Sequence, residues 1–258
     1  MKKVGIIRRN ELDKLHIISS LHRIGEQIVD IKSQADISIH AIDGYADPYI
    51  KLGGYHIQEF DMIIFEGMPA PVSRVVASRD QQYINQETEQ ALLAGLWQIT
   101  RPDNYSQLII INKGFVFAWN RMLYNPTSKL RWLGEIGWCT GTITSYYRFN
   151  ENKIVQLRSP EPGDTNTCVL TLTANKFVFT PEPALNEMPM RLLNNLIKKT
   201  QQCMGDIGLD WCSIPILIKG KNIWAFGFSI DIPADLGMQD IDMLLTDVVN
   251  NKKIPQLI

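Results

Sequence analysis

Cysteine and histidine are the residue types whose spacing would most directly reveal a metal site or a nucleophile. The four cysteines, at positions 139, 168, 203 and 212, include no Cys-x-x-Cys pair and have no histidine close by in sequence. The four histidines all lie between His16 and His56, and they form neither a His-x-His nor a His-Glu-x-x-His motif. This pattern favours buried free thiols over a zinc site or a disulfide.

Cys139 lies in the unusual run Trp138–Thr142, but no histidine near it in sequence could activate it as a nucleophile. A packed thiol is therefore the favoured interpretation. The chain also contains no nucleophile elbow, no Walker loop and no dinucleotide-binding fingerprint. Its chemistry has to be sought in residues that the fold brings together.

The most informative stretch is Gly205–Asp231, in which the end of a helix precedes two short predicted strands joined by a Lys-Gly-Lys-Asn turn. Because alternate residues of a strand point to the same side, Ala225, Gly227 and Ser229 are predicted to share one face, which carries no carboxylate. Pro215 falls in the first strand, where a proline indicates a sheet edge or a bulge.

The elements that precede this stretch alternate between strand and helix. Apolar runs at Lys3–Arg8, Asp61–Glu66 and Leu108–Ile111 predict buried strands, and helical periodicity at Asp80–Trp97 predicts a helix between the last two. This order is typical of an α/β layer. The Gly-Met-Pro-Ala-Pro segment after the second strand predicts a loop at a carboxyl end, where ligands often bind in open α/β sheets.

After Gly141 the pattern changes to short β-rich segments, and helices are predicted at Met190–Met204 and Met238–Asn250. The expected fold class is α/β (α+β), with an α/β domain over residues 1–140 and a mostly antiparallel sheet with helices over residues 141–258. The length of 258 residues and the hydrophobic content of 45% suit a chain that buries a substantial core.

Charge and hydropathy bound the class of partner. The net charge of -1 provides no basic face for nucleic acid. No stretch reaches the roughly 18 apolar residues of a membrane span, and the amino terminus does not read as a signal peptide. We expect a cytoplasmic protein that binds neither nucleic acid nor membrane.

Spread over most of the chain, these features resemble the ATP-grasp ligases, especially the peptide-modifying branch with its ribosomal-protein glutamate ligases and macrocycle-forming ligases. The acidic helix Gln82–Trp97 after a strand and loop, the Asn125-Pro126 pair before Lys129, and Ile207–Leu209 before the hairpin are similar to motifs of that family. The resemblance implies an N-terminal pre-ATP-grasp-like domain followed by a truncated ATP-grasp-like antiparallel sheet.

The resemblance also implies where nucleotide and metal would bind. Lys129, Tyr147 and Arg148 become candidate nucleotide-binding residues, with simple packing as the alternative for the Tyr-Tyr-Arg strand. In the family, an acid on the first hairpin strand and a Glu and an Asn on the second hold magnesium. In this chain Pro215 takes the place of the acid on the first strand, and a glycine and Ser229 take the places of the Glu and the Asn on the second.

Two further observations bear on activity. Asp231 lies one step beyond Ser229, and Asp210 precedes the first hairpin strand, so these three residues could form a relocated metal site. The segment between Arg148 and Thr167 is too short for the small β subdomain that closes over the nucleotide in the family.

The leading hypothesis is a noncatalytic ATP-grasp-like protein, without catalytic residues or cofactors, that binds a peptide or protein as a partner of a modifying enzyme. One alternative is an ATP-dependent carboxylate-amine ligase that uses ATP and magnesium at the relocated site. Another is an α/β protein that binds a small metabolite. A homo-oligomer is left open.

Overall fold

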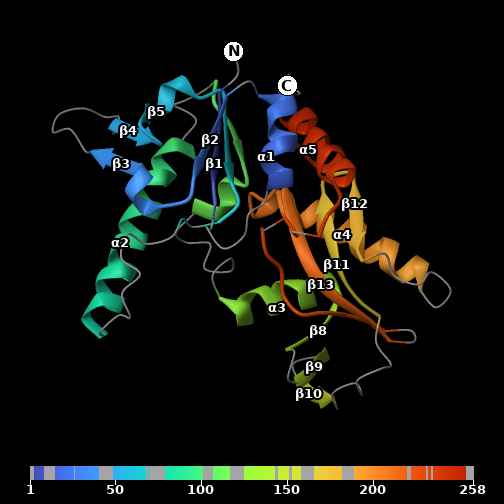
Figure 1. The fold of residues 1–258 in the computed structure, drawn as a ribbon. Helices are drawn as coiled ribbons and strands as arrows, with labels where there is room; N and C mark the ends of the chain where they lie inside the picture. Colours follow the sequence, from blue (N-terminus) through green and yellow to red (C-terminus); the bar gives the residue numbers. More distant parts are fainter. Residues whose placement is uncertain are drawn as a thin grey trace. The chain divides into compact units, whose positions relative to one another are not determined.

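The computed structural model describes residues 3–8, 15–25, 27–40, 49–67, 69, 79–100, 107–116, 125–142, 145–150, 153–157, 166–181, 189–219, 222–230, 232–233 and 235–253. The chain forms two compact units, Met1–Asn120 (unit 1) and Arg121–Ile258 (unit 2) (Figure 1). The domain boundary expected between residues 140 and 141 stays a prediction.

Unit 1 is built on a four-stranded parallel sheet of order β2-β1-β6-β7. Its strands are β1 (Lys3–Ile7), β2 (Gln27–Ile31), β6 (Met62–Phe65) and β7 (Ile109–Ile111). All four residues of β6 are buried, as expected for a parallel strand that is covered on both faces. The strands predicted from the three apolar runs are confirmed.

The other elements of unit 1 include a small antiparallel sheet of order β3-β4-β5. They are α1 (Leu15–Ile24), η1 (Gln34–Asp36), β3 (Ile37–His40), β4 (Tyr49–Leu52), β5 (Tyr55–His56), η2 (Ile57–Glu59), α2 (Arg79–Trp97), η3 (Gln98–Thr100) and η4 (Lys113–Val116). Helix α2 packs against β3 at Gly95, where a side chain would collide with Ile39. The helix predicted over Asp80–Trp97 is confirmed.

Unit 2 is built on a seven-stranded sheet of order β10-β9-β8-β14-β13-β11-β12, in which only the β8–β14 pair is parallel. The strands are β8 (Cys139–Thr142), β9 (Ser145–Asn150), β10 (Lys153–Leu157), β11 (Asn166–Thr173), β12 (Phe177–Thr180), β13 (Trp211–Lys219) and β14 (Asn222–Ala225). The mostly antiparallel sheet predicted after Gly141 is confirmed.

Three helices complete unit 2: α3 (Pro126–Ile136), α4 (Met190–Asp206) and α5 (Met238–Lys253). Helix α3 begins at Asn125, whose side chain accepts hydrogen bonds from two main-chain N–H groups of the first turn, and Pro126 occupies the first helical position. It ends at Gly137, whose φ of 115° suits a glycine C-cap.

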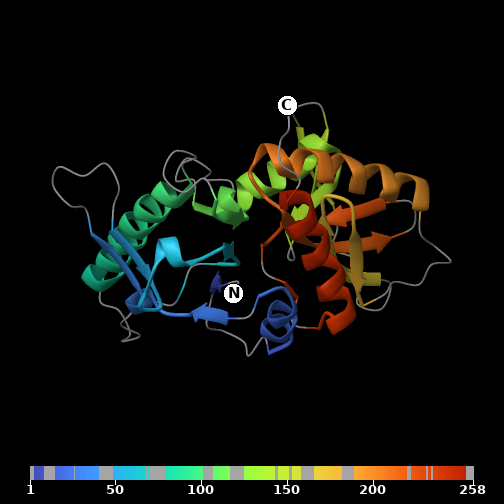
Figure 2. The ribbon, with the colours of Figure 1, turned by 90° about the horizontal axis from the view of Figure 1, so that it is seen from above.

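Helices α4 and α5 flank the sheet of unit 2 on opposite sides (Figure 2). On one face, which we call the α4 face, Cys212 of β13 contacts Met204 of α4 at 3.6 Å. On the other, the α5 face, Thr173 of β11 donates a hydrogen bond of 2.6 Å to Asp247 of α5. Alternation along the strands therefore assigns every strand residue to one face or the other.

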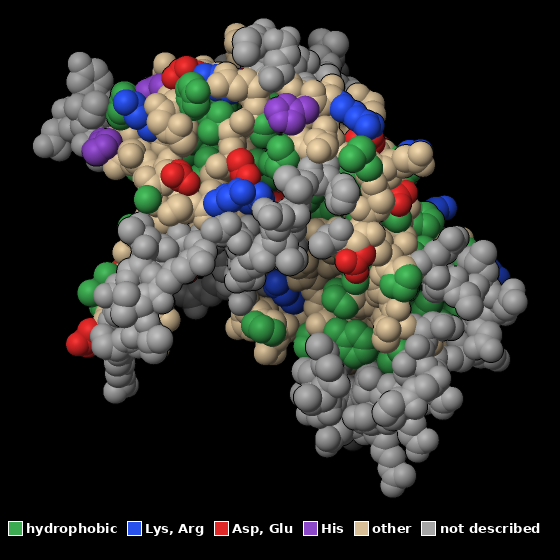
Figure 3. All heavy atoms as spheres, viewed as in Figure 1, with side chains coloured by type: hydrophobic (Ala, Val, Ile, Leu, Met, Phe, Trp, Pro, Cys, Tyr) green, Lys and Arg blue, Asp and Glu red, His purple; other side chains and the backbone are tan. Residues whose placement is uncertain are grey.

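Two surface properties can be stated for the described part of the chain. Lys and Arg side chains lie interspersed with Asp and Glu on the face drawn in Figure 3, without a large field of one sign. None of the described helices combines the length and the apolar character that a membrane span requires.

Candidate functional site

The hairpin that organises unit 2 lies in the middle of its sheet. Strand β13 pairs with β11 on one side and with β14 on the other, with Ile216 opposite Ala225. Helix α4 leads into the hairpin through a turn at Gly208, whose φ of 71° lies in the left-handed region that glycine adopts readily. The predicted succession of helix, turn and two strands is confirmed.

The ladder between the two hairpin strands is interrupted by a β-bulge. Phe226 N donates to Pro215 O at 3.1 Å, and Ser213 and Ser229 exchange main-chain hydrogen bonds of 2.8 and 2.9 Å. One residue of β13 therefore opposes two residues, Gly227 and the phenylalanine after it. Gly227 has a φ of 122°. Of the two alternatives that Pro215 indicated, a sheet edge or a bulge, the structure has the bulge. A proline has no N–H group with which to return the hydrogen bond of Phe226.

The bulge changes which side chains share a face. Ala225 lies opposite Ile216 on the α4 face and is fully buried. Ser229 lies opposite Ser213 and therefore on the α5 face, because the extra residue reverses the alternation. The expectation that Ala225, Gly227 and Ser229 form one face is wrong for this reason.

The α5 face near the bulge carries hydroxyl, proline and aromatic groups. Ser213 and Thr171 are buried, and their hydroxyls lie 3.1 Å apart. Pro215 is exposed, while Trp224 packs with a leucine, Cys139 and a half-buried phenylalanine. The packed thiol predicted for Cys139 is confirmed.

No strand of the seven-stranded sheet contains an aspartate or a glutamate over its described length. Carboxylates are the side chains that most often supply the hard oxygen ligands of magnesium. In addition, the described residues include no cluster of three or more His, Cys, Asp or Glu that could hold a metal ion. The sheet thus offers neutral oxygens at the hairpin.

Lys129, a candidate nucleotide-binding residue, is held at the bulge. Its Nζ donates a hydrogen bond of 2.7 Å to Phe228 O and lies 5.2 Å from the centre of the Phe228 ring. The same ring packs against Trp132, with 5.0 Å between the ring centres. Helix α3 is thereby fastened to the bulge, which gives Lys129 a role in holding this part of the fold together.

The other predicted site residues lie in different elements of unit 2. Tyr147 and Arg148 lie in β9, where they pair with Gln156 and Val155 of β10; their side chains, and the whole of Asp231, fall outside what the structure describes. Asp210 forms an ion pair of 2.9 Å with Lys252 of α5. Among these residues, therefore, the described structure brings Lys129 to the hairpin and links Asp210 to α5.

Two of the four thiols are expected to be unreactive. Burial raises the pKa of the Cys168 thiol to about 11 and that of the Cys212 thiol to about 12. Both remain protonated at neutral pH and are poor nucleophiles. All four cysteines are free, with Cys139 and Cys203 half-buried, so the prediction of buried free thiols is confirmed for Cys168 and Cys212.

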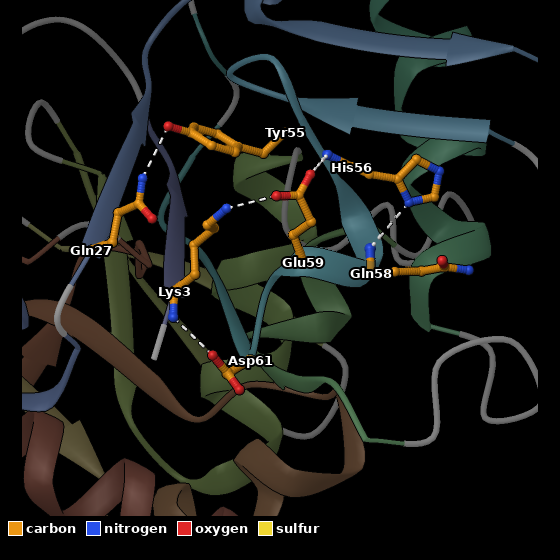
Figure 4. Close-up of polar contacts among 7 residues, drawn as sticks. All are labelled: Lys3, Gln27, Tyr55, His56, Gln58, Glu59 and Asp61. Atoms are coloured by element: carbon orange, nitrogen blue, oxygen red, sulfur yellow. Dashed lines mark hydrogen bonds and ion pairs between the residues drawn. The ribbon is translucent and has the colours of Figure 1, made fainter. Parts of the chain in front are cut away.

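Unit 1 carries a polar network at the amino end of its parallel sheet (Figure 4). Lys3 Nζ donates to Glu59 at 2.9 Å and lies 3.7 Å from the centre of the Tyr55 ring, and the main-chain N–H of Lys3 donates to Asp61 at 2.8 Å. Hydrogen bonds from Lys3 and from the His56 main chain lower the pKa of Glu59. This network joins β1 to the segment before β6.

The fold can be compared with known proteins. No family model matches the sequence, and no curated protein matches it either. Among solved structures, macrocyclase MdnB from Microcystis aeruginosa MRC is similar, with a TM-score of 0.57 and 11% identity over 97% of this chain and 98% of that one. Macrocyclase MdnC from the same organism, bound with the precursor peptide MdnA, is similar with a TM-score of 0.62 and 8% identity. The match covers 97% of this chain and 100% of that one.

A third similar structure is the RiPP-associated ATP-grasp ligase of Chryseobacterium gregarium in complex with ADP and a leader and core peptide. It has a TM-score of 0.60 and 9% identity, and the match covers 98% of this chain and 97% of that one. At sequence identities this low, the similarity concerns the fold alone. The fold expected from the sequence is confirmed: the chain has the fold of the peptide-modifying ATP-grasp ligases.

Proposed function

We propose that this chain is a noncatalytic ATP-grasp-like protein that binds a peptide or a protein as the partner of a modifying enzyme. The observation that carries the proposal is the lack of any Asp or Glu in the described strands of the seven-stranded sheet. In the alignment that the sequence resemblance implies, Pro215, Gly227 and Ser229 take the places of the magnesium ligands of the ATP-grasp ligases.

The chemistry of ATP-dependent ligation explains why this matters. Magnesium binds the phosphates of ATP and neutralises the charge that develops as the phosphoryl group is transferred. Neutral hydroxyls are weaker ligands for this hard cation than carboxylates. Ser213 and Thr171 also lie within hydrogen-bond distance of one another, in a buried environment. A site of this composition suits binding better than phosphoryl transfer.

Two observations support the proposal that the chain binds a peptide or a protein: the surface of the α5 face and the peptides bound in similar structures. The exposed Pro215 and the half-buried Phe226 give the α5 face an apolar surface beside the bulge, which suits contact with a peptide chain. MdnC is bound with the precursor peptide MdnA, and PsnB is an ATP-grasp ligase complexed with a minimal precursor, Mg and ADP. A peptide is therefore the first class of partner to test.

The experiment compares two lysine substitutions in tagged protein purified from its own cells and analysed by native mass spectrometry. Thr167→Lys places a charge on the α5 face, opposite Leu217, and Leu192→Lys places one at an exposed position of α4. We expect wild type and Leu192→Lys to carry a peptide or protein partner and Thr167→Lys to lose it. A wild-type protein that is monomeric and without a partner would contradict the proposal.

The ligase alternative makes a different demand on the molecule. It requires Asp210 to leave Lys252 and to meet Ser229, which lies opposite Ser213 further along the hairpin. If the alternative holds, Asp210→Asn abolishes magnesium-dependent ATP binding. Under the present proposal the same substitution only weakens the attachment of α5, which thermal unfolding would detect.

A further inference from the structure

The seven-stranded sheet of unit 2 ends on one side with β12, and no described part of the chain pairs with the outer edge of this strand. The sheet order places β12 beside β11 alone, and no described strand or isolated bridge continues the sheet beyond it. The residues of β12, Phe177–Thr180, include no charged residue, no proline and no glycine. Proteins usually blunt sheet edges with charges, prolines or bulges, because an open edge can pair with another strand.

The register of the β11–β12 hairpin determines which main-chain groups of β12 point outward. Thr173 N donates to Lys176 O at 2.9 Å, so these two residues form a hydrogen-bonded pair of the antiparallel ladder. Because such pairs alternate with non-hydrogen-bonded pairs, Val178 is the next residue of β12 that bonds to β11. The N–H and C=O groups of Phe177 and Phe179 therefore point away from β11, toward the open edge.

The hairpin that carries this edge is held in place from both faces of the sheet. Gln201 of α4 donates a hydrogen bond of 2.8 Å to Thr173 O. On the α5 face, Asp247 accepts hydrogen bonds from Thr173 Oγ1 at 2.6 Å and from Asn175 N at 3.1 Å. A strand that is already ordered in this way loses less conformational entropy when it pairs with another strand.

The two residues with outward main-chain groups also carry the aromatic side chains of the edge. Phe177 is 40% exposed and Phe179 is half-buried, and their rings lie edge to face with 5.7 Å between the ring centres. They lie opposite Leu172 and Leu170, on the α4 face of the sheet. The edge thus offers main-chain hydrogen bonds and an apolar surface to one and the same partner strand.

The sequence Phe177-Val178-Phe179 is the same in both directions, so this edge fits a second copy of itself. When two β12 strands run antiparallel about a two-fold axis at Val178, Phe177 of each copy lies opposite Phe179 of the other. These are the residues whose main-chain groups point outward, so each pair exchanges both of its hydrogen bonds. The same register brings the phenylalanines together as cross-strand aromatic pairs.

The charges along the strand are compatible with this self-pairing. Lys176, which immediately precedes β12, lies opposite Thr180 of the other copy in this register, so the two lysines do not face one another. The strand at the other edge of the same sheet, β10, contains Lys153. A lysine on an edge strand opposes pairing with a further strand. The sheet therefore has one edge strand with a charge and one without.

We propose that β12 forms a homodimer interface, in which the β12 strands of two copies pair antiparallel about Val178 and join the two sheets into one. Two-fold association of identical surfaces is the commonest arrangement of identical chains. The edge is short, so the dimer is weak and its population depends on protein concentration. The inference is independent of the function proposed above, which rests on the β13–β14 hairpin, and a second copy is recognised in native mass spectrometry by its own mass.

The two-fold register makes a specific prediction for disulfide cross-linking. Val178 lies directly opposite Val178 of the other copy in a non-hydrogen-bonded pair, with about 4.5 Å between the Cα atoms, which is within disulfide range. Thr180 lies on the same strand and the same face, but its two copies would be about 13 Å apart along the strands, which is too far. Val178→Cys and Thr180→Cys are therefore a matched pair.

Under mild oxidation we expect Val178→Cys to give a covalent dimer on a non-reducing gel and Thr180→Cys to stay mostly monomeric. Wild type is oxidised alongside, because its own cysteines are free and two of them are half-buried. Equal yields of dimer from the two variants would show that the chains do not associate in this register. A Val178→Cys protein that forms no more dimer than wild type would overturn the proposal.

Sedimentation velocity over about a hundredfold range of protein concentration then tests the interface without a cross-link. Phe177→Lys places a charge in the interface, and Leu192→Lys makes a matched change in α4, where the leucine is 42% exposed. We expect wild type and Leu192→Lys to form the same dimer and Phe177→Lys to dimerise at least about tenfold more weakly, since the substitution occurs twice in each dimer.

A wild-type protein that stays monomeric over the whole range of concentration would overturn the proposal, as would equal dimerisation of the two lysine variants. Folding of each variant is checked by far-UV circular dichroism and by the unfolding midpoint. If Phe177→Lys does not fold, the comparison of the two cysteine variants decides the question.

Discussion

The parallel sheet of unit 1 has charged side chains at both of its ends, whereas the seven-stranded sheet of unit 2 has no acid in its described strands. In unit 1, Lys3 pairs with Glu59 at the amino end, and Arg8 pairs with Asp30 at the carboxyl end. In unit 2, Asp210 and Asp247 lie outside the strands and contact residues around the sheet.

This difference shows that the chain does not simply avoid buried charge. Arg8 and Glu66 are both buried, so charge is accommodated in unit 1 where the surrounding protein compensates it. The lack of acids in the described strands of the seven-stranded sheet is therefore a property of that sheet and not of the whole chain. Substitutions in either unit can test this difference.

The largest effect is expected from breaking the partly buried ion pair between Arg8 and Asp30 in unit 1. Asp30→Ala removes the bidentate partner of Arg8, which is 3% exposed. Asp30 is partly exposed while Arg8 is buried, so the substitution removes two charge-assisted hydrogen bonds from a buried guanidinium. We expect the free energy of unfolding, measured with urea, to fall by about 3 kcal/mol relative to wild type. The control is Glu59→Gln at the amino end, which should change the urea midpoint little. Equal changes in the two variants would contradict the account.

A smaller effect is expected at the bulge of unit 2. Gly227 has a φ of 122° and open space where a side chain would begin, so Gly227→Ala tests the backbone conformation alone. We expect a loss of about 1–2 kcal/mol in unfolding free energy. Gly205→Ala, which also has open space but lies in α4, should gain about 0.5 kcal/mol. A gain in both variants would show that the bulge imposes no strain on alanine.

The smallest effect is expected at the acid that attaches α5 to the sheet. Burial raises the pKa of Asp247, but hydrogen bonds from Thr173 and Asn175 outweigh it and lower the pKa overall. We expect Asp247→Asn to cost about 1 kcal/mol at pH 7.

The pH dependence of this cost has a definite sign. A carboxyl with a lowered pKa stabilises the fold above its unfolded pKa of about 3.9, and the stabilisation is lost as the pH falls through the folded value. The difference between wild type and Asp247→Asn should therefore shrink in acid, as measured by urea unfolding from pH 7 to pH 3. A difference that stays constant with pH would show that the charge of Asp247 is not involved.

Much of the fold could be predicted because its signals are local. The buried strands β1 and β6 are continuous apolar runs, which is how parallel strands read in a sequence. The helix α4 and the following hairpin are separated by a glycine turn at Gly208. These elements required no knowledge of which strands are neighbours.

The details of the hairpin and of the buried charges could not be predicted, because they depend on register and strand order. The face of Ser229 changed because one extra residue at the bulge reverses a strict two-residue alternation. Arg8 and Glu66 follow neighbouring strands only because β1 pairs with β6, far along the chain. The ion pair of Asp210 with Lys252 likewise depends on where α5 packs.

The measurement that tests the central claim most directly is a calorimetric titration of the purified protein with ATP and with ADP, in the presence and in the absence of magnesium. We predict that magnesium does not promote nucleotide binding, because the hairpin lacks carboxylate ligands. Magnesium-dependent binding of ATP that is lost in Asp231→Ala would contradict the account and would assign a rebuilt metal site to unit 2.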